Sequence, residues 1–315
     1  MATRRARVPA LAKINLGLRV LAPRPDGFHE LRTVFQTISL ADTLDIAFTP
    51  GRRTSVEATA NIEIPGENIV ARAARAALDA MRTAGRVEIH IQKRIPLGAG
   101  LGGGSSDGAA VLLALPALVG RKLDAARRME LGAALGSDVP FFLLGGTAVA
   151  LGRGTELYPL EERRAAYALV ISPGIHVSTA GAYRDLDAAR RLTSDALQNM
   201  ISSFGSFVWE QAGCSSAGCG NDFEAVVFRA HPRLSALKRR LEKLGASPAL
   251  LSGSGSALYG VFGSRDQAQT AAKSLEKELV FPVRFVSRRA YRALWWRSLG
   301  GHITERVWPP QSQYA

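Results

Sequence analysis

A glycine-rich segment between a predicted strand and a predicted helix constrains the fold of this chain most. Residues 96–107 read Pro-Leu-Gly-Ala-Gly-Leu-Gly-Gly-Gly-Ser-Ser-Asp. The run Val87–Ile95 before them alternates apolar and polar residues, as a half-exposed strand does, and the run Gly108–Leu118 after them predicts an apolar helix. Glycines leave backbone N–H groups unshielded, and N–H groups that converge at a helix N-terminus favour an anion. We therefore expect a phosphate site here, with Ser105 and Ser106 as helix caps.

This segment differs from the phosphate loops of two common nucleotide-binding folds. It does not end in Gly-Lys-Ser or Gly-Lys-Thr, which excludes a Walker-type loop. Its glycines do satisfy G-x-G-x-x-G, and Asp124 follows at roughly the spacing of the ribose-binding acid in dinucleotide folds. The first strand of those folds is usually buried on both faces, whereas the strand predicted here is half exposed. A dinucleotide-binding dehydrogenase therefore stays an alternative hypothesis.

Length and composition describe a globular protein with room for two domains. The chain has 315 residues, 47% of them hydrophobic, and no apolar run reaches the length of a membrane span. The basic start resembles a signal peptide, but Lys13, Asn15 and Arg19 interrupt the apolar stretch, so we expect no export. Cys214 and Cys219 are too few for a disulfide scaffold. We expect reduced thiols and a cytoplasmic location.

The strong positive charge raises the question of a nucleic-acid partner. Lys and Arg number 40 and Asp and Glu 27, which leaves a net charge of +13. The arginines are spread over several predicted helices without an aromatic platform motif, a pattern typical of solvated helix surfaces. An RNA-binding module is nevertheless a third hypothesis. We expect no nucleic-acid partner and no membrane partner, and attraction of anionic substrates instead.

The order of predicted elements indicates an α+β protein with two domains. After the charge cluster Glu161–Arg164, strands and helices alternate in a way that predicts an antiparallel sheet. We expect domains at 1–163 and 164–290, an unassigned tail at 291–315, and a Gly/Ser-rich loop at 202–220. Strands are predicted at 10–20, 31–40, 42–48, 87–95, 141–144, 147–152, 167–172, 249–262 and 281–286, and helices at 67–84, 108–118, 123–135, 231–244 and 265–279.

Isolated polar residues stand out in two otherwise apolar segments. Lys13 and Asn15 lie two positions apart in a predicted strand, so both point to one face and offer a cation and an amide to an anionic or hydroxylated ligand. A solvent-exposed strand face explains the same pattern. Asp138 lies between a helix end and the pair Phe141 and Phe142. It is either a turn cap or, in a cleft, a base or charge-positioning group.

Two turn-forming segments add further candidates. Residues 251–259 form a second Gly/Ser-rich loop, which permits close backbone approach to a ligand or another loop, or else a tight hairpin. Residues 26–30 place Phe28 beside His29. A lone histidine is more often structural than functional, but an aromatic ring and an imidazole together can stack on a base and hydrogen-bond to it.

These segments together resemble one kinase superfamily. Residues 9–16, 96–107 and 251–259 are similar to the three motifs of the galactokinase–homoserine kinase–mevalonate kinase superfamily. Residues 24–29 (Arg-Pro-Asp-Gly-Phe-His) and 136–142 (Gly-Ser-Asp-Val-Pro-Phe-Phe) further resemble one branch of it. Members of that branch phosphorylate the 2-hydroxyl of a cytidine diphosphate-linked sugar alcohol in non-mevalonate isoprenoid synthesis. The motifs follow one another in the family's order.

The resemblance implies an ATP-dependent kinase with a ribosomal-protein-like βαβ N-terminal domain and a ferredoxin-like C-terminal domain. It implies Asp138 as catalytic base, Lys13 as its catalytic partner and Asn15 as a contact of the small-molecule substrate. Mg²⁺ is expected with ATP, and Ser106 is its expected protein ligand. We expect a monomer or weak homodimer. The expected contacts of the ATP phosphates are Pro96, Leu97, Gly98, Ala99, Gly100, Leu101, Gly102, Gly103, Gly104, Ser105 and Ser106.

The substrate side departs from the family at one residue. Phe28 stands where the family usually has tyrosine, and stacking on a cytosine ring needs only the aromatic face. The resemblance implies that His29 recognises the cytosine through hydrogen bonds. Residues 173–183 resemble the family segment that supplies a threonine, here Thr179, and a second aromatic ring, here Tyr183, opposite the first.

Overall fold

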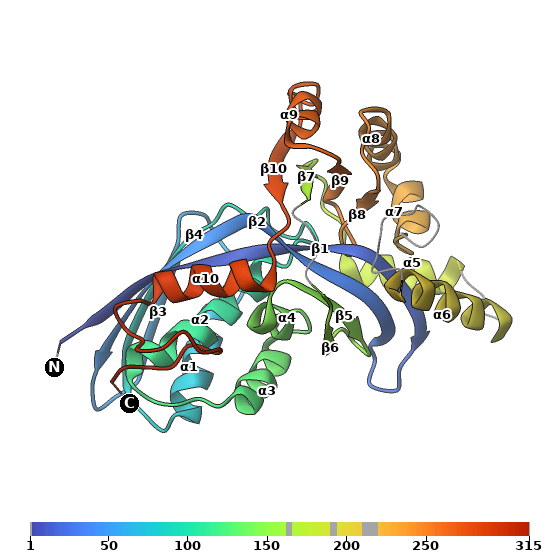
Figure 1. The fold of residues 1–315 in the computed structure, drawn as a ribbon. Helices are drawn as coiled ribbons and strands as arrows, with labels where there is room; N and C mark the ends of the chain where they lie inside the picture. The colour runs from blue at the N-terminus through green and yellow to red at the C-terminus, as the bar shows by residue number, and fades with distance from the viewer. Residues whose placement is uncertain (1, 162–165, 190–193, 210–219, 315) are drawn as a thin grey trace.

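Two β-sheets, each with its own helices, form the two domains (Figure 1). The computed structural model describes residues 2–161, 166–189, 194–209 and 220–314. The first sheet contains β1 (Arg4–Pro23), β2 (His29–Pro50), β3 (Ser55–Ala60), β4 (Gly85–Gln92), β5 (Thr147–Leu151) and β6 (Glu156–Pro159). The second contains β7 (Tyr167–Ser172), β8 (Ala249–Leu251), β9 (Leu258–Phe262) and β10 (Leu279–Arg284). The helices are α1 (Ile69–Ala80), α2 (Gly103–Val119), α3 (Ala125–Leu135), α4 (Val139–Leu144), α5 (Thr179–Ala189), α6 (Ser194–Trp209), α7 (Glu224–Ala230), α8 (Pro232–Lys243), α9 (Arg265–Lys273) and α10 (Arg288–Ser298).

A long antiparallel hairpin of β1 and β2 is the frame of the first domain. The strand order is β3-β4-β2-β5-β6, with β1 paired to β2, and α1 joins the parallel strands β3 and β4 in the expected βαβ unit. The predicted strands 31–40 and 42–48 are one strand, β2. Asp42 does not interrupt it, because its carboxylate accepts hydrogen bonds from the backbone N–H groups of Arg94 and Ile95.

Two local predictions in the helical layer were wrong. Ser105 and Ser106 do not cap α2, which begins at Gly103 after an N-cap glycine, Gly102, with φ of 70° and no side-chain cap. The segment 141–144 is helical rather than a strand. A short apolar run fits a buried helix or a buried strand equally well, so periodicity alone does not decide between them. Asn68 caps α1, since its side chain accepts a hydrogen bond from the backbone N–H of Val70.

The second domain is antiparallel throughout, as predicted, with the order β10-β7-β9-β8. The predicted strand at 249–262 is two strands, because the Gly/Ser-rich loop 252–257 separates β8 from β9. Residues 202–209 of the predicted 202–220 loop belong to α6. The rest of that loop up to 219, with Cys214 and Cys219, and the predicted boundary at 163/164 lie outside the described residues.

The C-terminal tail, which the sequence left unassigned, packs against the first domain. Tyr291 and Trp295 of α10 are buried in the same cluster as the β1–β2 hairpin and α2. The Tyr291 hydroxyl donates to the Phe142 carbonyl at 2.5 Å, and Trp308 Nε1 donates to the Leu143 carbonyl at 3.0 Å. The tail thus holds the helix α4 from its outer side.

A buried cluster joins the two domains. Ala12, Ile14 and Leu16 of β1 pack with Val170 of β7 and Tyr259 of β9 in this cluster. The Tyr259 hydroxyl also donates to a β1 backbone carbonyl at 2.8 Å. The glycine-rich segment of one domain and the Gly/Ser-rich loop of the other are therefore held next to each other.

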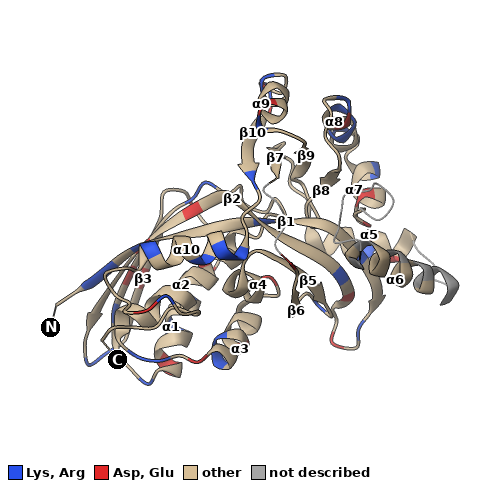
Figure 2. Cartoon of the chain, viewed as in Figure 1, with Lys and Arg blue, Asp and Glu red and all other residues tan. Residues whose placement is uncertain are grey.

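Charge and hydropathy patterns of the folded chain agree with the sequence analysis. Lys and Arg are distributed over several helices, including α3, α8 and α10, rather than along one stripe (Figure 2). Within the described residues, no helix has the length and apolar character needed to cross a membrane.

Candidate active site

A cavity of about 690 Å³ lies where the two domains meet. Its walls come from the β1–β2 hairpin, the loops before α2 and α4, helix α5 and the Gly/Ser-rich loop. The structure therefore gathers candidates that are far apart in the sequence. The predicted site residues that line it are Lys13, Asn15, Phe28, His29, Gly100, Gly102, Asp138, Thr179 and Tyr183.

Lys13 is the centre of the polar network in this cavity. Its Nζ lies 3.4 Å from Asp138 Oδ2 and donates to Asn15 Oδ1 at 2.8 Å. Lys13 is only 4% exposed, so the alternative of a solvated strand face is wrong. Asn15 Oδ1 also accepts the Gly253 N–H at 3.0 Å, and Asn15 Nδ2 donates to Thr33. Asn15 therefore orients Lys13 and links it to the Gly/Ser-rich loop, and its contact with a substrate stays a prediction.

Asp138 occupies the N-cap position of α4 but does not act as a cap. Its side chain makes no capping hydrogen bond and keeps 31% of its surface exposed beside the ammonium of Lys13. The helix behind it is anchored by Phe141 and Phe142, which are fully buried. A carboxylate held next to a cation, with one side open to a cavity, can accept a proton from a bound ligand.

The glycine-rich segment forms a loop that leads into α2. Gly98, Gly100 and Gly102 have φ of 63°, 79° and 70°, a region that residues with a Cβ rarely adopt. The first-turn N–H groups of α2 have no helical carbonyl to bond to, so they are available to an anion. This is the arrangement that the sequence analysis predicted for phosphate oxygens.

The Gly/Ser-rich loop of the second domain packs directly on this phosphate loop. Ser252 Oγ donates to the Gly100 carbonyl at 3.0 Å, and the Ala257 N–H donates to the Ala99 carbonyl at 3.1 Å. The close approach that the sequence allowed is thus an approach to another loop. The contact fixes the phosphate loop against the second domain.

Gly100→Ala is expected to distort this contact. An added Cβ at Gly100 would lie 2.1 Å from the Ser252 carbonyl oxygen, and φ is positive there. The loop must therefore shift, which moves its N–H groups away from the expected phosphate positions, and a loss of 1.4 kcal/mol of binding free energy corresponds to about a tenfold change in a binding constant. We expect the KM for ATP to rise roughly tenfold or more. Gly301→Ala is the control, because it lies outside the loop assigned to ATP, an added Cβ there would meet nothing within 4 Å, and its φ is not positive. Equal KM values for the two variants would contradict the prediction.

A buried ionic cluster beneath the phosphate loop was not predicted. Lys93 Nζ donates to Asp42 at 2.5 Å and to Asp107 at 2.8 Å, and all three residues are buried. An added Cβ at Gly103 would lie 3.3 Å from the same Nζ, which places the ammonium under the first turn of α2. The cluster ties the end of β4 to the start of α2. Asp107 closes the predicted motif, but no local pattern pairs it with the other two residues.

Burial raises the pKa of Asp107 to about 7, since the Asp42 charge adds to desolvation and together they outweigh the attraction of Lys93. Lys93 is desolvated too, but its two carboxylate partners raise its pKa. One ammonium thus neutralises two carboxylates only in part, and Asp107 keeps a proton into the neutral range. Its Oδ1 is buried and has no hydrogen-bond partner among the described residues, which is costlier for a charged carboxylate than for a neutral carboxyl group.

Asp107→Asn is expected to remove a pH dependence of stability. Between about pH 4 and pH 7 the folded wild type holds a proton on Asp107 that the unfolded chain has lost, so its free energy of unfolding falls as the pH rises. The fall is at most about 4 kcal/mol, at roughly 1.36 kcal/mol per pH unit. Urea unfolding at pH 5 and pH 8 measures the difference between wild type and variant. Parallel pH profiles of the two proteins would contradict the assignment, and Asp79→Asn, at an exposed position of α1, is the control.

The predicted base-binding residues lie at the outer end of the cavity. The rings of His29 and Tyr183 are stacked, with centroids 4.6 Å apart and 25° between their planes. Phe28 is 47% exposed, and the guanidinium of Arg153 lies 5.3 Å from its ring centroid. Thr179 exchanges a hydrogen bond of 2.9 Å with the Ser254 hydroxyl. Burial, with the Asp138 and Asp187 charges, raises the pKa of Tyr183 to about 12, so its hydroxyl stays protonated.

Several lining residues were missed by the sequence analysis. Arg153 follows β5, Arg184 and Asp187 belong to α5, and Ser254 lies in the Gly/Ser-rich loop. The two arginines add positive charge to the cavity that Lys13 also lines, which suits a ligand with several phosphates. Only Ser254 was part of a segment singled out in advance. No sequence pattern identifies the others, because the fold alone brings them to the cavity.

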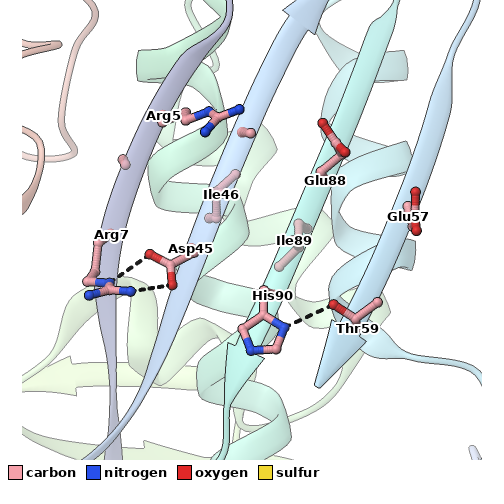
Figure 3. A pocket seen from close by; sticks show the side chains of 11 residues that line it. Arg5, Arg7, Asp45, Ile46, Glu57, Thr59, Glu88, Ile89 and His90 are labelled. Carbon is pink, nitrogen blue, oxygen red and sulfur yellow. Dashed lines mark hydrogen bonds and ion pairs between the residues drawn. The ribbon is translucent and has the colours of Figure 1, made fainter. Parts of the chain in front are cut away.

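A second hollow, of about 650 Å³, lies on the outer face of the first sheet and holds none of the predicted site residues (Figure 3). Its polar side chains on β1, β2 and β4 alternate with buried residues, among them Ile46 and Ile89, as expected for a sheet with one solvated face. Arg7 pairs with Asp45 there at 2.7 Å, and His90 with Thr59 at 3.0 Å. Both pairs join neighbouring strands, and Glu57 and Glu88 pair with Arg86 beside the hollow.

Ser106 of α2 has an oxygen atom that can bind a metal ion together with phosphate. Ser106 Oγ donates its proton to the Leu11 carbonyl at 2.7 Å, which leaves its lone pairs as acceptors, but the residue is 2% exposed. Among the described residues, no three His, Cys, Asp or Glu side chains converge as a preformed metal site. Mg²⁺ usually keeps few protein ligands and is held mainly by substrate phosphates.

Fold and site together define a two-domain small-molecule kinase, and family models agree. The model of the GHMP kinases N terminal domain matches residues 68–146, which contain the phosphate loop and Asp138. The model of the GHMP kinases C terminal domain matches residues 210–280, which contain the Gly/Ser-rich loop between β8 and β9.

Individual relatives narrow the assignment. The chain is 56% identical to the 4-diphosphocytidyl-2-C-methyl-D-erythritol kinase of Solibacter usitatus over 99% of this chain and 98% of that protein. It is 42% identical to the enzyme of the same name from a Geobacter species, over 85% of this chain and 93% of that protein. A crystal structure of 4-(cytidine 5'-diphospho)-2C-methyl-D-erythritol kinase superposes with a TM-score of 0.73 at 36% identity, covering 89% of this chain and 98% of that one. The chain therefore belongs to the 4-diphosphocytidyl-2-C-methyl-D-erythritol kinase family within the GHMP kinases.

Proposed function

We infer that this chain transfers the γ-phosphoryl group of ATP to the 2-hydroxyl of 4-diphosphocytidyl-2-C-methyl-D-erythritol, in the synthesis of isoprenoid precursors. Relatives that align with 99% and 85% of this chain carry that name. The observation that carries the chemistry is the Lys13–Asp138 pair, 3.4 Å apart, which faces the same cavity as the phosphate loop.

Asp138 is proposed as the general base. An alcohol holds its proton at neutral pH, so the proton must leave as the oxygen bonds to phosphorus. The Asp138 carboxylate accepts it while the bond between the γ-phosphorus and the bridging oxygen breaks and ADP leaves. Lys13, 3.4 Å from that carboxylate, offsets negative charge on the transferring phosphoryl oxygens.

Binding of ATP is assigned to the loop 96–106 and the first turn of α2. Backbone N–H groups and the positive end of the helix dipole bind the phosphates. Magnesium would be held by phosphate oxygens, with Ser106 as its proposed protein ligand. When bound, it neutralises phosphate charge and polarises the transferring group.

The outer end of the cavity is assigned to the substrate. Phe28 and Tyr183 are proposed to take the cytosine ring by stacking, and His29 to hydrogen-bond its edge. Thr179 and Asn15 are proposed as further substrate contacts. ATP and nucleotide-linked intermediates are cytoplasmic metabolites, so we place the reaction in the cytoplasm, in a monomer or weak homodimer without nucleic-acid or membrane partners.

A coupled ADP-release assay tests this function. Purified chain is given ATP and Mg²⁺ with 4-diphosphocytidyl-2-C-methyl-D-erythritol, and in parallel with mevalonate or homoserine. Turnover is expected with the cytidyl substrate and not with the other alcohols. Turnover with mevalonate or homoserine alone would keep the kinase class and reject the substrate. Absence of ATP binding in a parallel titration would reject the kinase assignment altogether.

A further inference from the structure

An ion pair at the rim of the cavity connects the two domains through the proposed base-recognition residue. His29 begins β2, and Asp187 lies on α5, 158 positions later. His29 Nε2 lies 2.9 Å from Asp187 Oδ1 and 3.0 Å from Oδ2. The His29 side chain is only 12% exposed, and both residues line the cavity.

This contact determines which ring nitrogen of His29 carries the proton. An ionised carboxylate can only accept hydrogen bonds, so the nitrogen that it contacts must be the N–H donor. In the neutral imidazole, Nδ1 then presents a lone pair. Among the described residues, Nδ1 has no hydrogen-bond partner. The stacked Tyr183 ring, 4.6 Å away, limits rotation of the imidazole plane.

A fixed acceptor at Nδ1 distinguishes cytosine from uracil. Cytosine carries an amino group at position 4, which donates, whereas uracil carries a carbonyl oxygen there, which accepts. Two acceptors that face each other leave both unpaired, and such a mismatch costs more than the loss of an apolar contact. We propose that Asp187 is a positioning residue that makes the site selective for a cytosine base by holding His29 as an acceptor. This inference rests on the proposed function, because it assumes that the substrate base binds beside His29.

A purely structural role for the pair makes a different prediction. If Asp187 only fastened α5 to β2, its loss would lower turnover of every substrate by a similar factor. The ratio of kcat/KM values for two substrates that differ only in the base is insensitive to such a common loss. The selectivity ratio is therefore the decisive readout.

The experiment measures kcat/KM for the cytidine substrate and its uridine counterpart with wild type, Asp187→Ala, Asp187→Glu and Asp187→Lys. We expect the cytosine preference to fall at least tenfold in the alanine variant and to be largely retained with glutamate. Lysine offers only donors to Nε2. With Asp187→Lys we therefore expect the ratio of kcat/KM for the cytidine substrate to that for the uridine substrate to fall further than with Asp187→Ala. Asp185→Ala is the matched control, an exposed acid on the same helix.

The possible failures are distinguishable. A wild type that prefers cytosine, with an unchanged ratio in Asp187→Ala and Asp187→Lys, would overturn this inference and leave the proposed function intact. A wild type with no turnover of the cytidine substrate would overturn the proposed function and this inference together. A wild type that is active but indifferent to the base would overturn the selectivity argument.

Discussion

Asp138→Asn is expected to lower kcat by roughly 10²–10⁴-fold, the usual contribution of a positioned general base, with little change in substrate affinity. Asparagine keeps the size of the side chain and cannot accept the hydroxyl proton. Because Asp138 makes no capping hydrogen bond in α4, the substitution removes no contact that the helix needs. Steady-state kinetics measure kcat, and equilibrium binding of the cytidyl substrate measures affinity separately.

The control for Asp138→Asn is Asp79→Asn, the same chemical change on the exposed face of α1. We expect its kinetics to match those of the wild type. A kcat for Asp138→Asn within a few-fold of the wild type would reject the general base. A parallel loss of substrate binding would instead make Asp138 a binding group, because only an interaction specific to the transition state lowers kcat alone.

Lys93→Met is expected to destabilise the folded chain by about 3–5 kcal/mol, the usual effect of removing one partner of a buried ion pair. Methionine fills a similar volume but removes the ammonium that lies between Asp42 and Asp107. Because all three positions are buried, water cannot replace this ammonium. Urea unfolding at pH 7 measures the loss of stability.

The Lys93→Met prediction has an internal control. In the triple variant Lys93→Met/Asp42→Asn/Asp107→Asn no buried charge of the cluster remains, so we expect part of the lost stability to return. Asp42 also accepts backbone N–H groups, and its asparagine replacement keeps one acceptor oxygen for them. A loss below about 1 kcal/mol in Lys93→Met would show that the cluster is solvated or protonated in a way that makes the ammonium dispensable.

Local sequence determined the parts of the site that depend on backbone chemistry. The glycines of the phosphate loop were predictable because its positive φ angles require residues without a Cβ, as at Gly98 and Gly100. Lys13 and Asn15 were predictable as a pair because strand geometry places alternate side chains on one face. The antiparallel second sheet followed from the order of its elements.

Only the tertiary structure decided which distant residues meet. The Asp42–Lys93–Asp107 cluster and the His29–Asp187 contact join residues that share no local pattern. The tail around Trp295 has no readable period, yet it is buried against the first domain. The apolar run at 141–144 became helical through packing rather than propensity. Local sequence patterns indicate which conformation the backbone of a short segment can adopt. Contacts between distant residues depend instead on how whole helices and strands bury their surfaces against one another.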